Sequence, residues 1–172
     1  MDEAPDTWIC TLPIRREILL LRPLRADDTP ALATFFASLS PQTLYQRYFL
    51  PLPAMSPQHI TDEIQRLNRL AMAGVVLLGR LIDHGSVVVL VEIARLDSDR
   101  STAEIAMTVA DAHQRQGIGR QMRAILPAVL AHHSIARVQA AALAENRAIM
   151  KLFGSAGATT SLGHGIVTFQ IG

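Results

Sequence analysis

Several residue types and patterns are scarce in this sequence, and each scarcity excludes a class of protein. The 172 residues include one cysteine, Cys10, which excludes an internal disulfide and a cysteine-based metal cluster. The formal net charge of +1 gives no electrostatic basis for binding nucleic acid or an anionic membrane surface. No apolar run reaches the roughly 20 residues of a membrane-spanning helix. The acidic N-terminus also lacks the features of a secretory signal, so we expect a cytoplasmic protein.

Metal binding is also not expected. The histidines are dispersed along the chain or, as with His132 and His133, adjacent, so they do not converge on one ion. Hydrophobic residues, by contrast, make up 49% of the chain, which is enough for a full core. The prolines at positions 5 and 13 predict an irregular segment over residues 1–16, and we expect residues 17–172 to form a single domain.

Hydrophobic periodicity and capping residues predict alternating strands and helices. Strands are expected at residues 17–22, in two apolar runs at 71–82 and 86–96, around Glu104, and at 137–143 and 166–171. Helices are expected to begin near Asp27 or Asp28, at Ser40-Pro41, at Ser56-Pro57, at Gly117 and at Asn146, the last ending at Gly157. The two apolar runs are typical of central strands that are covered on both faces. Pro127 is expected to kink or shorten the helix that contains it.

The most informative stretch joins a strand, a donor-rich turn and the start of a helix. Residues 103–109 end in β-branched Thr108 and Val109, as is typical of a strand. The turn that follows contains the sequence Gln114-Arg115-Gln116-Gly117-Ile118-Gly119. Glycine lets a ligand approach the backbone closely, and the first amides of a helix have no partner within it. Together with the helix dipole and with Arg115 and Arg120, these features predict a phosphate-binding site.

Two other phosphate-binding motifs do not match these residues. The dinucleotide-binding fingerprint requires a further glycine about three residues before Gly117, where Gln114 and Arg115 stand. The nucleotide P-loop requires a Gly-Lys-Ser/Thr ending, which is absent. A simpler alternative is a helix that only has flexible glycines near its start.

The pattern Gln/Arg-x-x-Gly-x-Gly after a strand resembles the pyrophosphate loop of the Gcn5-related N-acetyltransferase (GNAT) family. The order of the predicted elements is similar to the GNAT fold over nearly the whole chain. This resemblance implies an α/β fold with a mixed, mostly antiparallel sheet of about six to seven strands flanked by helices. Two of the strands would splay apart to admit acetyl-CoA, the co-substrate.

The resemblance also implies how acetyl-CoA is held. The amides of residues 114–119 would bind its pyrophosphate, and the backbone of residues 106–108 would hold the pantetheine arm like an added strand. Asn146 opens a segment that looks like the family's asparagine-led helix, in which the asparagine contacts pantetheine; a helix cap is its alternative role. The expected co-substrate residues are Ala106, Met107, Thr108, Gln114, Arg115, Gln116, Gly117, Ile118, Gly119 and Asn146.

A more particular similarity, to the catalytic domains of bacterial protein lysine acetyltransferases, lies in the front half of the chain and in one later strand. It rests on residues 21–28, 35–40, 45–49 and 103–111. The similarity implies a protein lysine as the acceptor. The alternatives are a small amine or amino acid as acceptor and, from another class, a non-catalytic acyl-CoA-binding regulatory module. A monomer and a homodimer are both compatible with the sequence.

Acetyl transfer requires a neutral amine, and a lysine amine with a reference pKa of about 10.4 is mostly protonated near pH 7. Glu104 stands at the position that resembles the family's glutamate base, on the strand beside the co-substrate. In an apolar cleft the pKa of its carboxylate would rise toward the working range. Glu92, on the preceding strand, is a rival base, and an ion pair with an arginine is the alternative role for Glu104.

The leaving thiolate is expected to depart without a tyrosine acid. Many relatives place a tyrosine seven residues after the asparagine, but that position is Phe153. Tyr45 and Tyr48 are the only tyrosines, and we expect both in the core or in the wall of the acceptor site. Cys10 is distant from the motifs in sequence, so we expect direct attack in a ternary complex and no covalent acyl-enzyme.

Overall fold

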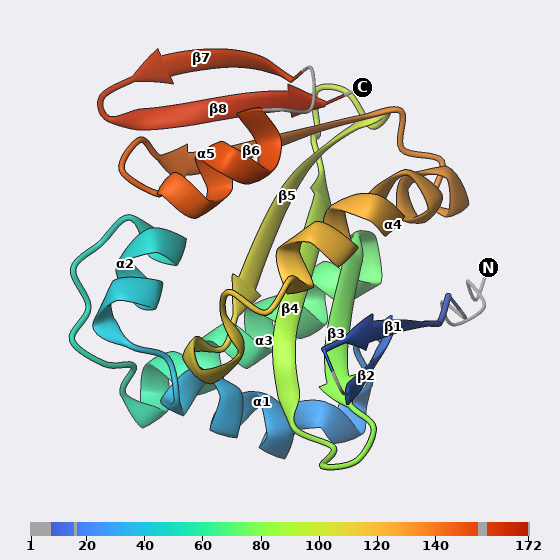
Figure 1. Cartoon of the computed structure of the whole chain (residues 1–172), viewed down its shortest axis with the longest axis vertical. Helices are drawn as coiled ribbons and strands as arrows, with labels where there is room; N and C mark the ends of the chain where they lie inside the picture. The colour runs from blue at the N-terminus through green and yellow to red at the C-terminus, as the bar shows by residue number, and fades with distance from the viewer. Residues whose placement is uncertain (1–7, 16, 155–157, 172) are drawn as a thin grey trace.

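The computed structural model describes residues 8–15, 17–154 and 158–171. Its centre is an eight-stranded sheet in the order β1-β2-β3-β4-β5-β6-β8-β7 (Figure 1). The strands are β1 (Cys10–Ile14), β2 (Glu17–Pro23), β3 (Val75–Leu81), β4 (Val87–Arg95), β5 (Thr102–Val109), β6 (Arg137–Leu143), β7 (Thr159–Gly163) and β8 (Ile166–Ile171). Neighbouring strands are antiparallel except β5 and β6, which are parallel. The expected mixed sheet is confirmed; its two short edge strands, β1 and β7, are additional to the six strands located in the sequence.

Helices cover both faces of the sheet. Their bounds are α1 (Thr29–Ala37), α2 (Pro41–Tyr48), α3 (Pro57–Ala73), α4 (Ile118–His132) and α5 (Arg147–Gly154). On one face, Phe36 of α1 and Leu67 of α3 share a core with Leu78 and Leu90 of the sheet. On the other face, α4 packs through residues such as Met122. β3 and β4 are therefore covered on both sides, as their apolar sequences predict.

A smaller core lies beyond the parallel strand pair. Phe153 of α5 packs against Phe169 of β8, with the two ring centroids 5.7 Å apart, and Ala142 of β6 belongs to the same cluster. This cluster fixes α5 next to β6 and β8 (Figure 1). No helix among the described residues is long and apolar enough to cross a membrane.

The sequence signals at the starts of α2 and α3 are confirmed. Ser40 and Ser56 each precede a proline, and each side-chain oxygen accepts a hydrogen bond from the backbone amide three residues later, at 3.2 Å. Proline is tolerated there because the N–H it lacks would have no partner in the helix. Asp28 precedes α1, but its carboxylate pairs with Arg22 and Arg80 and does not cap that helix.

Several boundaries differ from the sequence prediction. Residues 10–14, expected to be irregular, form β1 and pair with β2. Residues 71–73 continue α3 and do not begin a strand. α4 runs through Pro127 to His132 and is not shortened by it. β7 has no counterpart in the prediction, and the expected helix end at Gly157 lies outside the described residues.

β5 and β6 diverge along their length (Figure 1). Parallel pairing joins Thr102, Ala103 and Glu104 to Arg137, Val138 and Gln139, and it stops there. Beyond this point β5 pairs with β4 and β6 pairs with β8. The expected splay is confirmed. In the described part of the chain, it leaves one backbone edge of residues 105–109 without a strand partner.

Candidate active site

A cleft of about 660 Å³ opens where β5 and β6 separate. Its walls come from β5, the loop before α4, the first turns of α4, the middle of β6, α5 and, from the opposite side, α2. Every site residue predicted from the sequence lines this cleft except Gln116. The structure therefore brings together residues from three separate segments of the chain.

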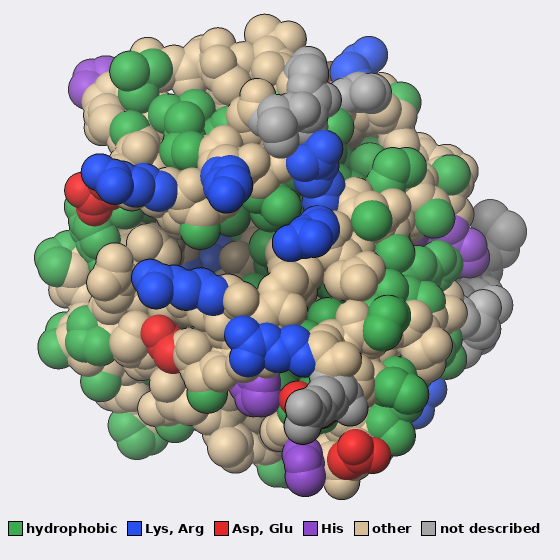
Figure 2. All heavy atoms as spheres, in the orientation of Figure 1, with side chains coloured by type: hydrophobic (Ala, Val, Ile, Leu, Met, Phe, Trp, Pro, Cys, Tyr) green, Lys and Arg blue, Asp and Glu red, His purple; other side chains and the backbone are tan. Residues whose placement is uncertain are grey.

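Basic side chains surround this cleft. Figure 2 shows Lys and Arg side chains gathered around a hollow in the face that Figure 1 presents. The charged residues that line the cleft include four arginines, Arg47, Arg115, Arg123 and Arg147, and three acids, Glu104, Asp111 and Glu145. A lining with several guanidinium groups suits a ligand that carries multiple phosphate charges.

The loop between η2 (Asp111–His113) and α4 presents a run of unused amide donors. Arg115 and Gly117 have left-handed backbone conformations, with φ of 58° and 89°. Among the described residues, the amides of 117–120 find no backbone or side-chain acceptor, and the hydrogen bonds of α4 begin with Gln121 donating to Gly117. Left-handed residues in such a turn bring N–H groups into one concave surface, and the helix dipole adds partial positive charge. The loop therefore offers unused backbone donors and partial positive charge at the start of α4.

The glycines at positions 117 and 119 suit this loop for different structural reasons. Gly117 adopts the left-handed φ that other residues rarely adopt, although a Cβ there would meet nothing within 4 Å. At Gly119, a Cβ would lie 3.4 Å from Leu152 and 3.6 Å from Met107, and both of these residues line the cleft. A long side chain at position 119 would therefore occupy space beside the unused amides.

The side chains of Gln114 and Gln116 are used within the loop. Gln114 Nε2 donates to Thr43 Oγ1 at 2.9 Å and to the Val109 carbonyl at 3.1 Å. Gln116 Nε2 donates to the Ala112 carbonyl at 3.0 Å. The backbone amide of Gln114 is also occupied, because it donates to the Asp111 carbonyl at 3.2 Å. In this structure, these two residues shape the loop.

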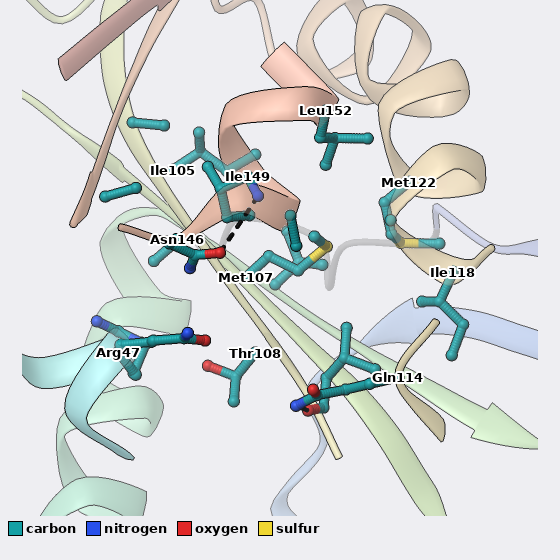
Figure 3. A pocket seen from close by; sticks show the side chains of 18 of the residues that line it. Arg47, Ile105, Met107, Thr108, Gln114, Ile118, Met122, Asn146, Ile149 and Leu152 are labelled. Atoms are coloured by element: carbon teal, nitrogen blue, oxygen red, sulfur yellow. Dashed lines mark hydrogen bonds between the residues drawn. The ribbon is translucent and has the colours of Figure 1, made fainter. Parts of the chain in front are cut away.

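Asn146 lies across the cleft from β5 (Figure 3). Its Oδ1 accepts a hydrogen bond from the backbone amide of Ile149 at 3.3 Å, so it caps α5, the alternative role considered from the sequence. An asparagine also carries an NH₂ donor, so capping leaves this group available to a ligand. Opposite it, residues 106–108 line the cleft from the unpaired edge of β5. An extended ligand can pair with such an edge.

The two glutamates considered as bases have different surroundings. Glu104 is the last residue of β5 that pairs with β6, and its exposed side chain lines the cleft. Glu92 lies opposite Ala106 in the sheet and is only 4% exposed. Its carboxylate is bound by Arg47, at 2.6 Å, and by Arg66, and it is not among the residues that line the cleft. The arginine pairing considered for Glu104 is therefore found at Glu92, whereas the side chain of Glu104 is exposed.

Helix α2 supplies cleft residues that the sequence analysis does not assign to the site. Gln46 and Arg47 line the cleft on the side opposite α5 (Figure 3 shows Arg47). Arg47 is held by Glu92 of β4, and Arg66 of α3 links Glu92 to Glu63. The contact between Arg47 and Glu92 spans 45 residues of sequence, so local patterns contain no signal for it. The only pointer is the family resemblance of residues 45–49.

Among the described residues that line the cleft there is no tyrosine. The Tyr48 hydroxyl donates to Glu63 Oε1 at 2.9 Å. Burial is the main cause that raises the pKa of Tyr48 well above its usual range, and the negative charge of Glu63 is the second. Phe153, at the position where many relatives have a tyrosine, lines the cleft.

Comparison with known proteins agrees with this geometry. A model of the acetyltransferase (GNAT) domain matches residues 19–159. The GNAT domain of PAT from S. lividans is similar over 98% of this chain and 99% of that chain, with 25% sequence identity and a TM-score of 0.81. Ribosomal-protein-S5-alanine acetyltransferase from Vibrio fischeri is similar over 94% and 96% of the two chains, with 13% identity and a TM-score of 0.72.

A third similar structure, yncA from Salmonella typhimurium, contains its cofactor acetyl-CoA. It covers 89% of this chain and 92% of its own, with 17% identity and a TM-score of 0.69. The family model spans most of the described residues, including β5, the loop and α4. The chain therefore belongs to the GNAT family and is an acetyltransferase with acetyl-CoA as its co-substrate.

Proposed function

We propose that this enzyme acetylates the side-chain amine of a protein lysine, with Glu104 as the general base. The observation that carries the proposal is the position of Glu104 at the fork between β5 and β6, exposed and in the lining of the cleft. The acceptor amine must lose a proton as it attacks. A carboxylate that reaches both the cleft and solvent can take that proton and release it.

The position proposed for acetyl-CoA follows from two sets of unused backbone groups. Its pyrophosphate would lie on the amides of residues 117–120, with Arg115 beside them. Its pantetheine arm would lie along residues 106–108, with Asn146 opposite. β5 runs from the fork toward the loop, and the thioester is at the end of pantetheine that is remote from the pyrophosphate. The thioester would therefore lie toward Glu104.

The proposed reaction is a direct attack within a ternary complex. The amine nitrogen bonds to the thioester carbonyl carbon, the carbon–sulfur bond breaks, and the proton of the amine passes to Glu104. CoA leaves as a thiolate, which is a tolerable leaving group near neutral pH because a thiol has a reference pKa of about 8.5. Glu92 is the weaker candidate for the base because two guanidinium groups already bind its carboxylate.

Two observations favour a protein lysine as the acceptor. Glu104 is exposed, so a long side chain on the surface of another protein can reach it. In addition, residues 21–28 and 45–49 resemble the catalytic domains of lysine acetyltransferases, and the GNAT domain of S. lividans PAT is similar over nearly the whole chain.

The experiment compares acceptors at saturating acetyl-CoA. Peptides with a blocked N-terminus and a single lysine are tested against the same peptides with arginine in its place, and against a panel of small amines and amino acids. Mass spectrometry then locates the acetyl group. We expect transfer to the lysine peptides and loss of this transfer in Glu104→Gln.

One feature of the chain simplifies this experiment. Lys151 is the only lysine of the enzyme, so Lys151→Arg removes self-acetylation of a side chain from the signal. Faster transfer to a small amine than to any lysine peptide or extract protein would overturn the lysine assignment. Binding of acetyl-CoA without transfer to any acceptor would favour a non-catalytic acyl-CoA-binding module.

A further inference from the structure

The carboxylate of Asp111 joins the end of β5 to the start of α2. It accepts three hydrogen bonds, from the Ser40 amide at 2.9 Å, from Ser40 Oγ at 2.6 Å and from Thr43 Oγ1 at 2.8 Å. Ser40 is the N-cap of α2, and Asp111 begins η2, directly before the phosphate-binding loop. A region 70 or so residues away in sequence is thereby attached to the loop.

The Thr43 hydroxyl connects Asp111 to the loop through two hydrogen bonds. A hydroxyl has one proton and two lone pairs. The proton of Thr43 is directed at Asp111, so an oxygen lone pair remains to accept the hydrogen bond from Gln114 Nε2 at 2.9 Å. The other proton of that amide nitrogen is directed at the Val109 carbonyl, at 3.1 Å. Both donors of the Gln114 side chain are therefore committed, and Thr43 itself is 7% exposed.

This anchored glutamine immediately precedes the part of the loop that departs from ordinary backbone conformation. Arg115 has a left-handed φ of 58° without being glycine, and Gly117 follows at 89°. Such conformations persist only when the surrounding structure holds them. A loop that is ordered before its ligand arrives avoids the entropic cost of ordering on binding. The groups that hold this loop in place should therefore contribute to its affinity for the ligand.

We propose that Thr43, oriented by Asp111, is a positioning residue that holds the pyrophosphate loop ready for acetyl-CoA through the side chain of Gln114. The proposal rests on the assignment of this loop in the proposed function. It assigns helix α2 a second role beside its contribution to the cleft wall. The opposite end of α2 is fixed independently by the pair between Arg47 and Glu92, so loss of the Thr43 hydroxyl is expected to leave the helix in place.

The test uses Thr43→Val, which keeps the shape of the side chain and removes its hydroxyl, and Thr43→Ser, which keeps the hydroxyl. Losing one buried hydrogen-bonded anchor predicts an increase of about tenfold in the KM and the calorimetric Kd for acetyl-CoA. We expect little change in kcat for Thr43→Val and a return toward wild-type values in Thr43→Ser. Thr61→Val is the matched control, because Thr61 is exposed on α3 and its hydroxyl donates only to the Pro57 carbonyl, at 3.0 Å.

A second substrate separates positioning of the loop from general damage. Acetyl-pantetheine lacks the pyrophosphate, so its kcat/KM should be the same for Thr43→Val as for the wild type. An equal loss with both substrates, or unchanged affinity for acetyl-CoA together with a lower melting temperature, would overturn the proposal and leave Thr43 with a structural role. Failure of the wild-type enzyme itself to discriminate acetyl-CoA from acetyl-pantetheine would contradict the loop assignment instead.

Discussion

Glu104 of β5 lies opposite Gln139 of β6 in the last parallel pair before the two strands separate. β5 is paired with β6 as far as Glu104, which fixes the backbone of this residue. The cleft opens directly after Glu104, where the two strands separate. A base is most useful when its backbone is rigid and its side chain faces the acceptor. The fork gives Glu104 a paired backbone and places its side chain in the lining of the cleft.

Glu104→Gln tests this position. We expect a folded protein that binds acetyl-CoA normally and whose kcat is about 100- to 10,000-fold lower, which is the usual contribution of general-base assistance. The measurement is thiol release under conditions in which chemistry limits the rate. Glu145→Gln is the matched control, since Glu145 is also an exposed carboxylate in the cleft lining, and a much smaller loss is expected there. An unimpaired Glu104→Gln enzyme would transfer the role to Glu92 or to a water relay.

Gly119→Glu tests the phosphate loop. A side chain at this position would start 3.4 Å from Leu152 and would place a negative charge beside the unused amides of 117–120. We expect the Kd for acetyl-CoA in calorimetry to rise by about 100-fold or more, because repulsion between like charges adds to the steric block. Gly163→Glu on β7 is the control, since a Cβ there meets nothing within 4 Å. Equal affinities for Gly119→Glu and the wild type would show that the pyrophosphate lies elsewhere.

The buried carboxylate of Asp28 should be a source of acid sensitivity. It is fully buried, binds Arg22 through two hydrogen bonds of 2.7 and 2.6 Å, and pairs with Arg80 at 3.1 Å. Burial raises the pKa of Asp28, but the hydrogen bonds from Arg22 and from the Arg25 amide, with the charges of Arg22 and Arg80, outweigh burial and lower it below its usual value. The contribution of ionised Asp28 to the stability of the folded protein is therefore complete above the unfolded-state pKa of about 3.9. It is lost as the pH falls through the lower folded-state pKa.

Asp28→Asn is expected to lower the free energy of unfolding by about 3 to 5 kcal/mol near neutral pH, because two guanidinium groups lose their partner charge. The difference in the free energy of unfolding between Asp28→Asn and the wild type should become smaller at pH values below about 3, where the carboxylate of the folded wild type also becomes protonated. Urea unfolding at the two pH values measures this, with the exposed neighbour Asp27→Asn as control. A difference that stays constant with pH would contradict the assignment of the acid sensitivity to Asp28.

The sequence predicts the elements whose signals are local. The serine–proline helix starts, the covered strands β3 and β4, and the loop before α4 all depend on residues close together in the chain, and all are present. β1 is hidden because Pro13 interrupts its pattern, although proline is compatible with an edge strand. β7 is hidden because every one of its residues is exposed, so it shows no hydrophobic alternation.

The non-local parts of the site could not be predicted in this way. Asp111 and Ser40 are 71 residues apart in sequence, and Arg47 and Glu92 are 45 apart, so their contacts exist only after the sheet has formed. Hydrophobic periodicity predicts that α2 is a helix, but not that its first turn contacts the segment between β5 and α4. Glu92 and Glu104 are the same residue type, so in the sequence only the family resemblance favours Glu104. Their difference in burial and ion pairing is visible only in the structure.

The last prediction concerns protonation of the departing thiolate. No tyrosine is among the described residues that line the cleft, and Phe153 stands where many relatives have one. Tyr48 already donates its hydroxyl proton to Glu63, and the raised pKa of Tyr48 makes it a poor acid near neutral pH. We therefore expect Tyr45→Phe and Tyr48→Phe each to keep most of the wild-type kcat. The thiolate would take its proton from solvent or receive the proton that the amine loses.

Tyr48→Phe should nevertheless affect stability, because it removes one hydrogen bond from the buried carboxylate of Glu63, worth about 1 kcal/mol. Tyr45→Phe is the natural control, since Tyr45 has no such contact to Glu63. The two variants thus separate folding from chemistry. We expect a lower melting temperature for Tyr48→Phe alone, and we expect both variants to keep the kcat and the basic limb of the pH–rate profile of the wild type. A large fall in kcat for either variant, with folding and acetyl-CoA binding intact, would show that a tyrosine from the front of the chain reaches the thiolate during the reaction.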